Sequence, residues 1–455
     1  MEKFLVMPVK LNDVYEMRID NLSDSQGIGS IDGFKVFVDG LLPGEIARVM
    51  VTQLKKNYAV GKALDLLKRS KDRIEPQCPI YNECGGCQLQ HLSYSAQLNW
   101  KRQQVIDALK RIGKLNLKNI LIKDTIGMNE PWNYRNKMQF PVSKANSDVK
   151  IGCYAKGTHD VIDVNNCLIQ RELNNEILQA ARKVIAKFKI PIYDEDKHRG
   201  ILRHVMGRVG ANGEIMLVLV TAVENLPNAK SIVRALRNEL PQITSIQQNI
   251  QPQHNNVILG RKTNILYGKR TIVDKIGDFK FNISARSFFQ VNTSQAEKLY
   301  KTALDFADLH GNEIVVDVYC GTGTITLFLA KRAKFAYGIE IVSSAIADAK
   351  VNARVNNIRN VEFVVGDATV MLPRLGVKPD VIVIDPPRAG CDEAVLKSIV
   401  KMTPSRVVYV SCNPSTLARD LAILEMNGFK VEKVQPVDMF PQTSHIESVT
   451  LLRHM

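Results

Sequence analysis

The chain lacks the features that would place a protein in a membrane or outside the cell. It has 455 residues but no run of about 18 apolar residues that would predict a transmembrane helix. Its first residues, MEKFLVMPVKLND, contain neither a long apolar segment nor a small-residue cleavage site, so secretion is not expected. Eight cysteines without a secretion signal favour a reducing compartment over a disulfide framework. We therefore expect a cytoplasmic protein with no membrane partner.

Internal repeats and low-complexity tracts are also missing. Hydrophobic residues make up 45% of the chain, which is enough to bury a core and excludes a disordered protein. Two or three domains are expected at this length, because single cores rarely grow beyond about 250–300 residues.

Positive charge is in excess, and it is unevenly distributed. The formal net charge is +15, yet residues 301–455 hold 17 basic and 17 acidic side chains. Residues 1–54 hold five basic and eight acidic side chains, whereas residues 55–150 hold 18 and eight, and residues 151–300 hold 21 and 13. A basic surplus can reflect nucleic acid, an anionic membrane or solubility alone. Its concentration in residues 55–300 predicts that this region binds a polyanion.

Three domains are predicted from the pattern of elements. Short β-segments between Gly and Pro turns in residues 1–65 predict a small β-barrel, either a binder of oligonucleotides or a purely structural barrel. Residues 66–275 mix helices and strands, as an α+β domain does. Residues 276–455 alternate helices with apolar β-runs, which predicts a multidomain α/β protein ending in a doubly wound, Rossmann-like, mostly parallel sheet.

The individual elements can be given by residue. In the first two domains the patterns predict strands at 14–19, 35–38, 46–51, 215–221 and 257–259, and helices at 94–112, 173–188 and 227–240. In the third they predict a helix at 416–427 and strands at 314–318, 336–339, 361–365, 381–384, 407–410, 431–436 and 448–452.

A glycine loop in the third domain is typical of a nucleotide-type ligand site. Asp317-Val-Tyr-Cys-Gly-Thr-Gly-Thr324 follows the first strand and opens a helix, so its backbone can approach a ligand closely. Glu340 ends the next strand and could accept two ribose hydroxyls, and Asp367 follows the third strand, where an adenine would lie. The third glycine of the dinucleotide motif is missing, which favours S-adenosylmethionine over NAD. An unliganded structural turn is the remaining alternative.

Two further loops follow strands of the same sheet. Asp385-Pro386-Pro387-Arg388 is a stiff loop similar to that of amino-methyltransferases, although those enzymes have an aromatic residue where Arg388 stands. Ser411-Cys412-Asn413-Pro414 places a cysteine near a helix N-terminus, which predicts a lowered thiol pKa. A buried, inert cysteine is the alternative, but its position beside Asp385 favours a reactive thiol.

These motifs resemble the RNA uracil-5 methyltransferases that carry an N-terminal TRAM domain. The resemblance spans the chain and includes seven motifs in order: Leu42-Pro-Gly-Glu45, Cys78-x5-Cys84-Gly-Gly-Cys87, Ser287-Phe-Phe-Gln-Val-Asn292, Asp317-x-x-Cys-Gly-x-Gly, Asp385-Pro-Pro-Arg388, Ser411-Cys-Asn-Pro414 and His445-Ile-Glu447. The bacterial branch that acts on large-subunit ribosomal RNA is the most similar. The resemblance implies an OB-like TRAM barrel, a central iron–sulfur domain and a C-terminal methyltransferase domain.

The resemblance also implies roles for individual residues. Cys412 would attack C6 of uracil, which makes C5 nucleophilic, and Glu447 would remove the C5 proton, with His445 as the alternative base. The methyl donor would contact Gln290, Tyr319 and Glu340, and Asp385 would contact either the uracil or the donor. Phe288 would stack on the extruded base. Thr324 departs from the asparagine common in the family, so no donor contact is assigned to it.

Three closely spaced cysteines point to a metal site. Cys78, Cys84 and Cys87 do not fit the paired spacing of zinc sites or the spacing of radical enzymes. The resemblance implies a 4Fe-4S cluster with Cys167 as the fourth ligand, which leaves Cys153 as a core residue. Free or disulfide-bonded cysteines are the alternative. A role in folding or in RNA shape recognition is expected for such a cluster, far in sequence from Cys412.

The expected function is therefore S-adenosylmethionine-dependent C5 methylation of uridine in 23S ribosomal RNA, before or during subunit assembly, without an obligate protein partner. Transfer RNA is the alternative substrate. A non-catalytic iron–sulfur RNA-binding protein would have lost Cys412 or Glu447, and both are present. A NAD-dependent oxidoreductase would need a third glycine and a second nucleotide-binding half.

Overall fold

The computed structural model of the protein describes residues 8–145 and 148–455. Residues 1–7 lie outside the described residues. They are the first residues of the predicted barrel and of the N-terminal segment in which no secretion signal was found. The chain divides into an N-terminal unit, Met1–Gln97 with Gln442–Ser444, and a large unit, Leu98–Pro441 with His445–Met455. Across the described ranges, no helix has both the length and the apolar character needed to cross a membrane.

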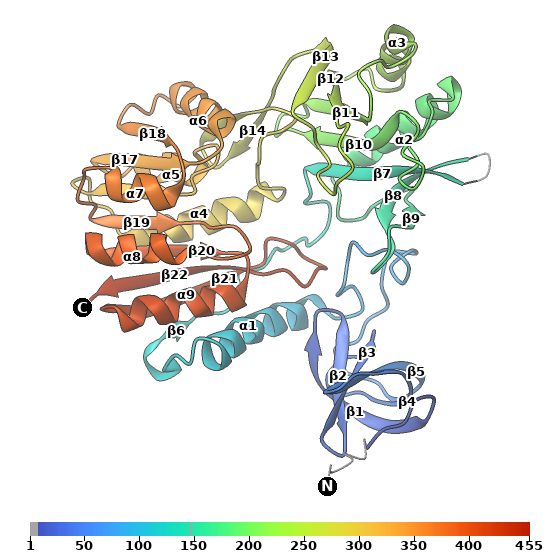
Figure 1. Ribbon diagram of the computed structural model, residues 1–455, viewed down its shortest axis with the longest axis horizontal. Helices are drawn as coiled ribbons and strands as arrows, with labels where there is room; N and C mark the ends of the chain where they lie inside the picture. The colour runs from blue at the N-terminus through green and yellow to red at the C-terminus, as the bar shows by residue number, and fades with distance from the viewer. Residues whose placement is uncertain (1–7, 146–147) are drawn as a thin grey trace. The chain divides into compact units, whose positions relative to one another are not determined.

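The N-terminal unit contains a closed five-stranded barrel, drawn in blue in Figure 1, with the strand order β1-β2-β3-β5-β4. Its strands are β1 (Val14–Ser23), β2 (Gln26–Ile31), β3 (Phe34–Asp39), β4 (Ile46–Leu54) and β5 (Tyr58–Lys68). Alternate residues of each strand point inward, as Val36 and Val38 do in β3 and Val49 and Val51 do in β4. The predicted β-barrel is therefore confirmed.

The large unit contains a seven-stranded sheet, in the order β13-β12-β11-β10-β7-β8-β9. Its strands are β7 (Lys137–Ala145), β8 (Asp148–Tyr154), β9 (Val161–Asp163), β10 (Leu202–Val209), β11 (Ile215–Thr221), β12 (Ile243–Ile250) and β13 (Lys262–Gly268). Helices α2 (Glu172–Phe188) and α3 (Ala229–Glu239) accompany it. A hairpin of β14 (Ile272–Ile276) and β15 (Phe279–Ile283) follows.

The predicted strand at residues 257–259 is wrong. Val257 is exposed, and this segment is a turn held by side chains: Asn255 Oδ1 accepts from the Val257 N–H at 3.0 Å, and Gln251 Nε2 donates to the Val257 carbonyl at 2.5 Å. The edge strand β13 begins only at Lys262. Local side-chain hydrogen bonds compete successfully here with strand pairing.

The second sheet of the large unit has eight strands, in the order β18-β17-β16-β19-β20-β22-β21-β6. They are β6 (Leu121–Ile122), β16 (Ile314–Val318), β17 (Phe335–Glu340), β18 (Val361–Val365), β19 (Val381–Ile384), β20 (Arg406–Ser411), β21 (Phe429–Val437) and β22 (Glu447–His454). The five strands from β18 to β20 are parallel, and β22 is antiparallel to both of its neighbours. This is the expected doubly wound sheet.

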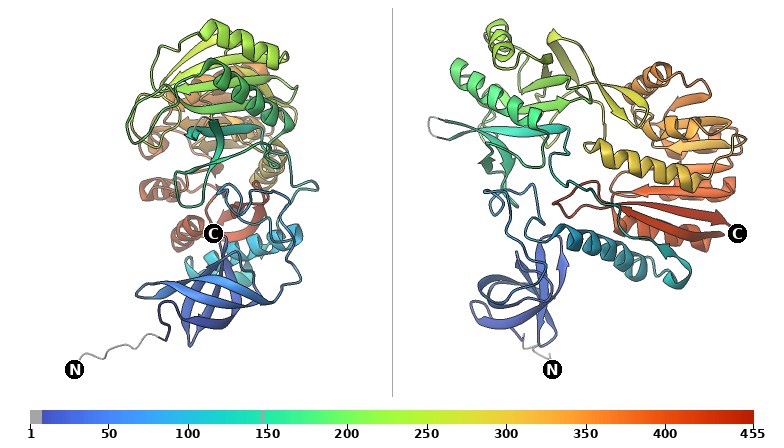
Figure 2. Two further views of the ribbon diagram at one scale, coloured as in Figure 1. Left: turned by 90° about the vertical axis from the view of Figure 1, so that its right-hand side faces the viewer. Right: turned by 180° about the vertical axis from the view of Figure 1, so that it is seen from behind.

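Helices cover both faces of this sheet (Figures 1 and 2). They are α1 (Tyr94–Arg111), α4 (Thr293–Ala307), α5 (Thr324–Ala330), α6 (Ser343–Val355), α7 (Ala368–Arg374), α8 (Glu393–Met402) and α9 (Pro414–Met426). Val381 and Val383 of β19 pack in the cluster that holds α4, α5 and α6. Ile382 and Ile384 pack in the cluster that holds α1, α7, α8 and α9. Alternate residues of β19 are thus buried in two different hydrophobic cores, one on each face of the sheet.

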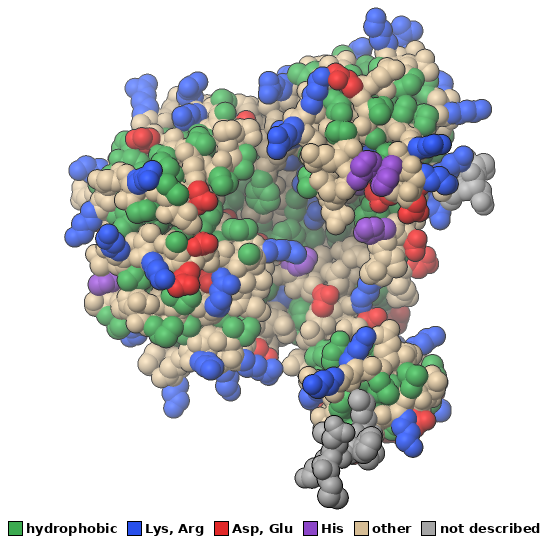
Figure 3. Space-filling model, in the orientation of Figure 1, with side chains coloured by type: hydrophobic (Ala, Val, Ile, Leu, Met, Phe, Trp, Pro, Cys, Tyr) green, Lys and Arg blue, Asp and Glu red, His purple; other side chains and the backbone are tan. Residues whose placement is uncertain are grey.

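The same apolar cluster that holds α4 extends into the seven-stranded sheet, where it includes Met206 and Met216. Figure 3 shows a hollow between the two sheets of the large unit, with Lys and Arg side chains at its margin. Helix α1 is fixed to the eight-stranded sheet by a fully buried ion pair, in which Lys101 Nζ lies 2.6 Å from Asp438 Oδ1. The predicted division into residues 1–65, 66–275 and 276–455 stays a proposal.

Candidate active site

The ends of adjacent parallel strands supply most of the predicted site residues. Strand β16 leads into the glycine loop, β17 ends at Glu340, β19 is followed by Asp385 and β20 is followed by Cys412. These four strands are neighbours in the sheet, so their carboxyl ends share one edge. Open α/β sheets bind ligands at this edge.

The loop after β16 is held open by its backbone conformation and by Glu340. Tyr319, Gly321 and Gly323 have φ values of 70°, 56° and 79°, in the left-handed region that favours glycine. Glu340 Oε2 accepts from the Gly321 N–H at 3.2 Å, and Oε1 accepts from the Val342 N–H at 2.9 Å. Each oxygen keeps a second lone pair, so the predicted ribose contact is geometrically available.

Tyr319 and Asp367 line a cavity of about 570 Å³, together with residues of α8 and α9. Asp367 caps α7, because its Oδ1 accepts from the hydroxyl and the backbone N–H of Thr369 at 2.7 and 2.8 Å. These bonds lower the pKa of Asp367, so its carboxylate is ionised at neutral pH. The cavity therefore offers a carboxylate and a tyrosine where the donor's adenine was predicted.

Gln290 and Thr324 both hydrogen-bond to the hydroxyl of the buried Tyr300. Thr324 Oγ1 donates to it at 3.3 Å. Burial raises the pKa of Tyr300, and the nearby carboxyl groups of Asp385 and Glu447 act in the same direction. The hydroxyl therefore stays protonated and lies within electrostatic range of both carboxyl groups.

Cys412 is half-buried directly after β20, and its predicted low pKa is wrong. Burial raises the pKa of its thiol to about 11, with Glu447 and Asp385 acting in the same direction and Arg388 opposing them. Desolvation and two carboxyl groups outweigh the N-terminus of α9, because a helix dipole contributes only about 0.3–1 kcal/mol near the surface. The thiol is thus protonated at neutral pH unless a cation lies beside it.

The carboxyl groups of Asp385 and Glu447 lie within electrostatic range of this thiol. Burial raises the pKa of Asp385 to about 7. Burial also raises the pKa of Glu447 well above its usual value, with Asp385 adding to the effect and Arg388 opposing it. Glu447 is the first residue of β22, which pairs antiparallel with β20, and the last pair of the two strands joins the neighbours of Cys412 and Glu447, Ser411 and Ser448.

His445, the alternative base, is exposed and faces Arg388. Arg388 Nη2 lies 3.3 Å from His445 Nε2 and 3.4 Å from Nδ1. Glu447, in contrast, is buried at the start of β22. The geometry therefore favours Glu447 over His445 as the base.

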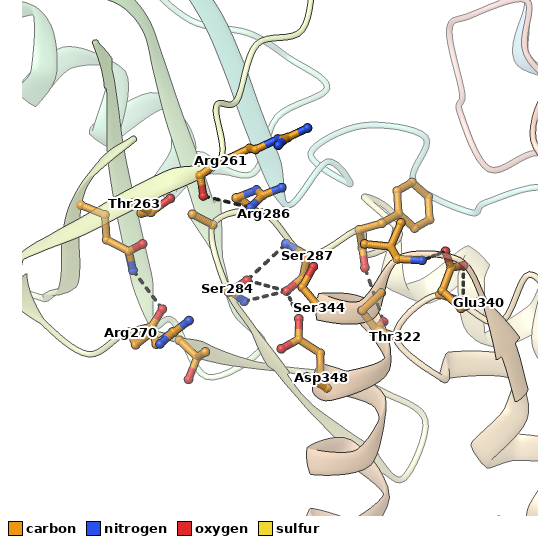
Figure 4. A pocket seen from close by; sticks show the side chains of 18 of the residues that line it. Arg261, Thr263, Arg270, Ser284, Arg286, Ser287, Thr322, Glu340, Ser344 and Asp348 are labelled. Atoms are coloured by element: carbon orange, nitrogen blue, oxygen red, sulfur yellow. Dashed lines mark hydrogen bonds between the residues drawn. The ribbon is translucent and has the colours of Figure 1, made fainter. Parts of the chain in front are cut away.

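Phe288 is 70% exposed on a firmly held loop between β15 and α4. Its neighbours Ser287 and Phe289 are buried. Ser287 Oγ donates to Asp348 Oδ2 at 2.7 Å (Figure 4), and its carbonyl accepts from the buried Arg208 Nη2 at 2.5 Å. An exposed aromatic ring on a fixed loop is suited to stacking on an unpaired base.

The structure does not support the predicted metal site. Cys78, Cys84 and Cys87 are half-buried in one loop of the N-terminal unit, where Cys84 Sγ accepts from the Gly86 N–H at 3.4 Å. In the described part of the chain, no group of three or more His, Cys, Asp or Glu side chains is placed to hold a metal ion. Cys167 belongs to the large unit. The residues as placed do not form the ligand set of the predicted iron–sulfur domain.

Comparison with known proteins decides the family. Residues 93–371 and 376–455 match the tRNA (uracil-5-)-methyltransferase family, and residues 8–64 match the TRAM domain. The chain belongs to this methyltransferase family.

Similar proteins cover the whole length of the methyltransferase. It is 52% identical over 450 residues, 98% of each chain, to an uncharacterized RNA methyltransferase of Halalkalibacterium halodurans. It is 48% identical over 460 residues, 100% of each chain, to one of Clostridium acetobutylicum. The solved Pyrococcus abyssi tRNA (uracil-54, C5)-methyltransferase, in complex with S-adenosyl-L-homocysteine, has 27% identity and a TM-score of 0.76 over 96% of this chain and 99% of that one. The family resemblance seen in the motifs is confirmed, and the chain is an RNA methyltransferase of the uracil-5 type.

Tyr300 is the residue of the methyltransferase site that its sequence did not indicate. It is one of 12 tyrosines and lies on an ordinary amphipathic helix, so only the fold shows its contact with the loops that carry Gln290 and Thr324. Arg388 stands out in the sequence because it departs from the amino-methyltransferase pattern. In the structure Arg388 lies beside His445 and acts to lower the pKa of the Cys412 thiol, which an aromatic residue at this position could not do.

Proposed function

We propose that this methyltransferase transfers a methyl group from S-adenosylmethionine to C5 of a uridine in 23S ribosomal RNA, in the cytoplasm, before or during subunit assembly. The proximity of Cys412 to Glu447, at the strand-end edge where such sheets bind ligands, carries this proposal. C5 of uracil is too weak a nucleophile to accept a methyl group directly. A nucleophile and a base on the same site solve this problem.

The reaction proceeds in three steps. The Cys412 thiol first loses its proton to solvent, the thiolate then adds to C6 of uracil, and the ring electrons pass to C5 and O4 as an enolate. The donor supplies a methyl group on a sulfonium cation, and C5 takes it as the sulfonium becomes a thioether. Glu447 then removes the C5 proton, the C5–C6 double bond forms again and the thiolate leaves.

The raised pKa values suit these roles. A carboxylate made more basic by burial is a stronger acceptor for the C5 proton. The thiol of Cys412 needs a positive charge nearby to ionise, and the sulfonium cation together with Arg388 supplies it. Nucleophilic attack is thereby favoured only once the donor is bound.

The donor is proposed to lie along the strand ends. Glu340 would accept the ribose hydroxyls, Asp367 and Tyr319 would face the adenine, and Gln290 and Asp385 would lie toward the methionine end or the uracil. The open backbone at Gly321 and the hydrogen-bonded carboxylate of Glu340 support this assignment. Phe288 is proposed to stack on an RNA base.

Transfer RNA is the second candidate substrate. The solved relative with 27% identity is described as a tRNA (uracil-54, C5)-methyltransferase, and this likeness extends over the full chain. Ribosomal RNA is preferred because the motifs most resemble that branch of the family. The chemistry at Cys412 is the same for both substrates.

The iron–sulfur cluster stays a prediction of the sequence, with Cys78, Cys84, Cys87 and Cys167 as its ligands. An anaerobic preparation of the full chain is expected to contain about four irons per chain, as a 4Fe-4S centre requires. Iron and zinc analysis tests it, and stoichiometric zinc would refute it.

The substrate is decided by methylating purified RNA from cells that lack this gene. Total ribosomal RNA and total transfer RNA are incubated separately with the enzyme and S-adenosylmethionine carrying a labelled methyl group. We expect 5-methyluridine to form in ribosomal RNA and not in transfer RNA. The reverse result would assign the enzyme to transfer RNA, and no transfer to either would refute the proposed function.

A further inference from the structure

A second cavity, of about 530 Å³, lies between the two sheets of the large unit. One wall comes from β12 and β13 of the seven-stranded sheet and from the loop that carries Phe288. The opposite wall comes from the glycine loop after β16, the end of β17 and helix α6. This volume lies within the range of about 300–1,000 Å³ found for small-molecule sites.

Three exposed arginines line this cavity, and they come from separate segments of the chain. Arg261 precedes β13, Arg270 follows it, and Arg286 lies two residues before Phe288. Figure 4 shows Arg261 and Arg286 side by side, where Arg286 Nη1 donates to the Arg261 carbonyl at 3.0 Å. Within the ranges that the structure describes, none of the three guanidinium groups pairs with a carboxylate.

The carboxylates of the cavity are already engaged by the protein. Asp348 accepts from the Ser287 hydroxyl, and Glu340 accepts from the backbone N–H groups of Gly321 and Val342. Figure 4 places both of them away from Arg261 and Arg286. The three arginines thus outnumber the two carboxylates that line this space, which suits an anionic ligand with several oxygen acceptors.

The position of the cavity indicates which anion it takes. Phe288 lines it, whereas Cys412, Glu447 and Asp385 are not among the described residues that do. The reacting base would therefore lie outside this space. An aromatic ring and arginines in one cavity suit a nucleotide next to the target uridine. Its base can stack on the ring, and the guanidinium groups can bind its phosphate oxygens.

We propose that this cavity is a second RNA subsite, which binds the phosphate of a nucleotide next to the target uridine through Arg261, Arg270 and Arg286. The inference rests on the proposed function. It extends that function by assigning contacts with the RNA backbone to a defined place beside the glycine loop after β16. Such contacts fix the register of the RNA and carry no sequence information themselves.

The test compares the wild type with Arg261→Gln/Arg286→Gln and with Arg270→Gln, using total ribosomal RNA from the gene-deleted cells. We expect the KM for RNA to rise about tenfold or more in the double variant, with kcat and S-adenosylmethionine affinity unchanged. The slope of log affinity against log salt should fall by about 1 for each phosphate that the variant no longer binds. Arg270→Gln removes no hydrogen bond recorded for its side chain, so it reports on binding without disturbing the fold.

Arg234→Gln, on the exposed face of α3, is the matched control and should leave KM and the salt slope unchanged. If the wild type methylates RNA but the cavity variants keep its RNA affinity and salt slope, the proposed subsite is wrong and the proposed function still stands. Weakened donor binding with unchanged RNA affinity would also overturn it, because the arginines would then bind the donor's carboxylate. A wild type that methylates no RNA would refute the proposed function instead.

Discussion

Cys412 and Glu447 adjoin the same residue pair at the end of an antiparallel strand pair. Ser411 of β20 pairs with Ser448 of β22, Cys412 directly follows Ser411, and Glu447 directly precedes Ser448. The electrostatic effect of Glu447 on the Cys412 thiol agrees with this proximity. The proposed nucleophile and the proposed base thus lie at the same end of this strand pair.

Cys412→Ala is expected to abolish methyl transfer while S-adenosylmethionine still binds. The thiol is the proposed covalent group, whereas the proposed donor contacts come from the loops after β16 and β18, the end of β17 and the loop that carries Gln290. Single-turnover transfer and calorimetric donor binding measure the two properties separately. Full activity in this variant would refute the covalent mechanism.

Glu447→Gln is expected to trap a covalent complex between protein and RNA. Addition of Cys412 and methyl transfer precede proton removal, so the methylated adduct accumulates when the base is removed. Denaturing gels and mass spectrometry of the cross-linked peptide detect it. His445→Gln provides the matched control, and it should turn over with no adduct; the opposite pattern would make His445 the base.

Much of this arrangement could be predicted because it depends on local pattern. The carboxyl ends of parallel strands meet at one edge, so the order of the motifs alone predicts that the loops at Asp317, Glu340, Asp385 and Cys412 converge. The closed barrel and the alternation of helices and strands are similarly local signals. Nothing local indicates that residues 121–122 pair with β21, because that contact depends on packing of segments about 300 residues apart.

The electrostatics could not be predicted from the motif. A cysteine before a helix N-terminus usually has a lowered pKa, but the direction depends on which charged groups the fold brings close. The sequence does not show that Glu447 and Asp385 surround Cys412 or that burial outweighs the helix. The wrong strand at 257–259 has the same origin, since the bonds from Asn255 and Gln251 are specific to this turn.

Asp385→Asn is expected to increase stability at pH 8 while reducing methyl transfer. The folded pKa of about 7 lies above the unfolded value, so wild-type stability falls as pH rises from about 4 to 7. The difference between these pKa values corresponds to about 4 kcal/mol, and partial exposure of Asp385 should reduce the gain to about 1–3 kcal/mol.

Urea unfolding at pH 4.5 and pH 8 measures this, and the advantage of Asp385→Asn should be small at the lower pH. Asp367→Asn is the contrasting control, because hydrogen bonds from Thr369 lower the pKa of Asp367. Its effect should have the opposite sign, with wild-type stability falling as pH falls. A pH-independent effect of Asp385→Asn would contradict the raised pKa.

The donor's positive charge is expected to activate Cys412 before any RNA reacts. In the free enzyme, a thiol pKa of about 11 means that alkylation of Cys412 by iodoacetamide should rise about tenfold per pH unit up to pH 9. S-adenosylmethionine and S-adenosylhomocysteine differ by one methyl group and one positive charge, so both should shield the thiol to a similar extent. A cation within about 4–6 Å lowers a thiol pKa by about 1–3 units. Alkylation at pH 8, followed by mass spectrometry of the Cys412 peptide, should therefore be at least about tenfold faster with S-adenosylmethionine. Equal rates with the two ligands would mean that the sulfonium lies too far from Cys412 to stabilise the thiolate, and that Arg388 alone must do so.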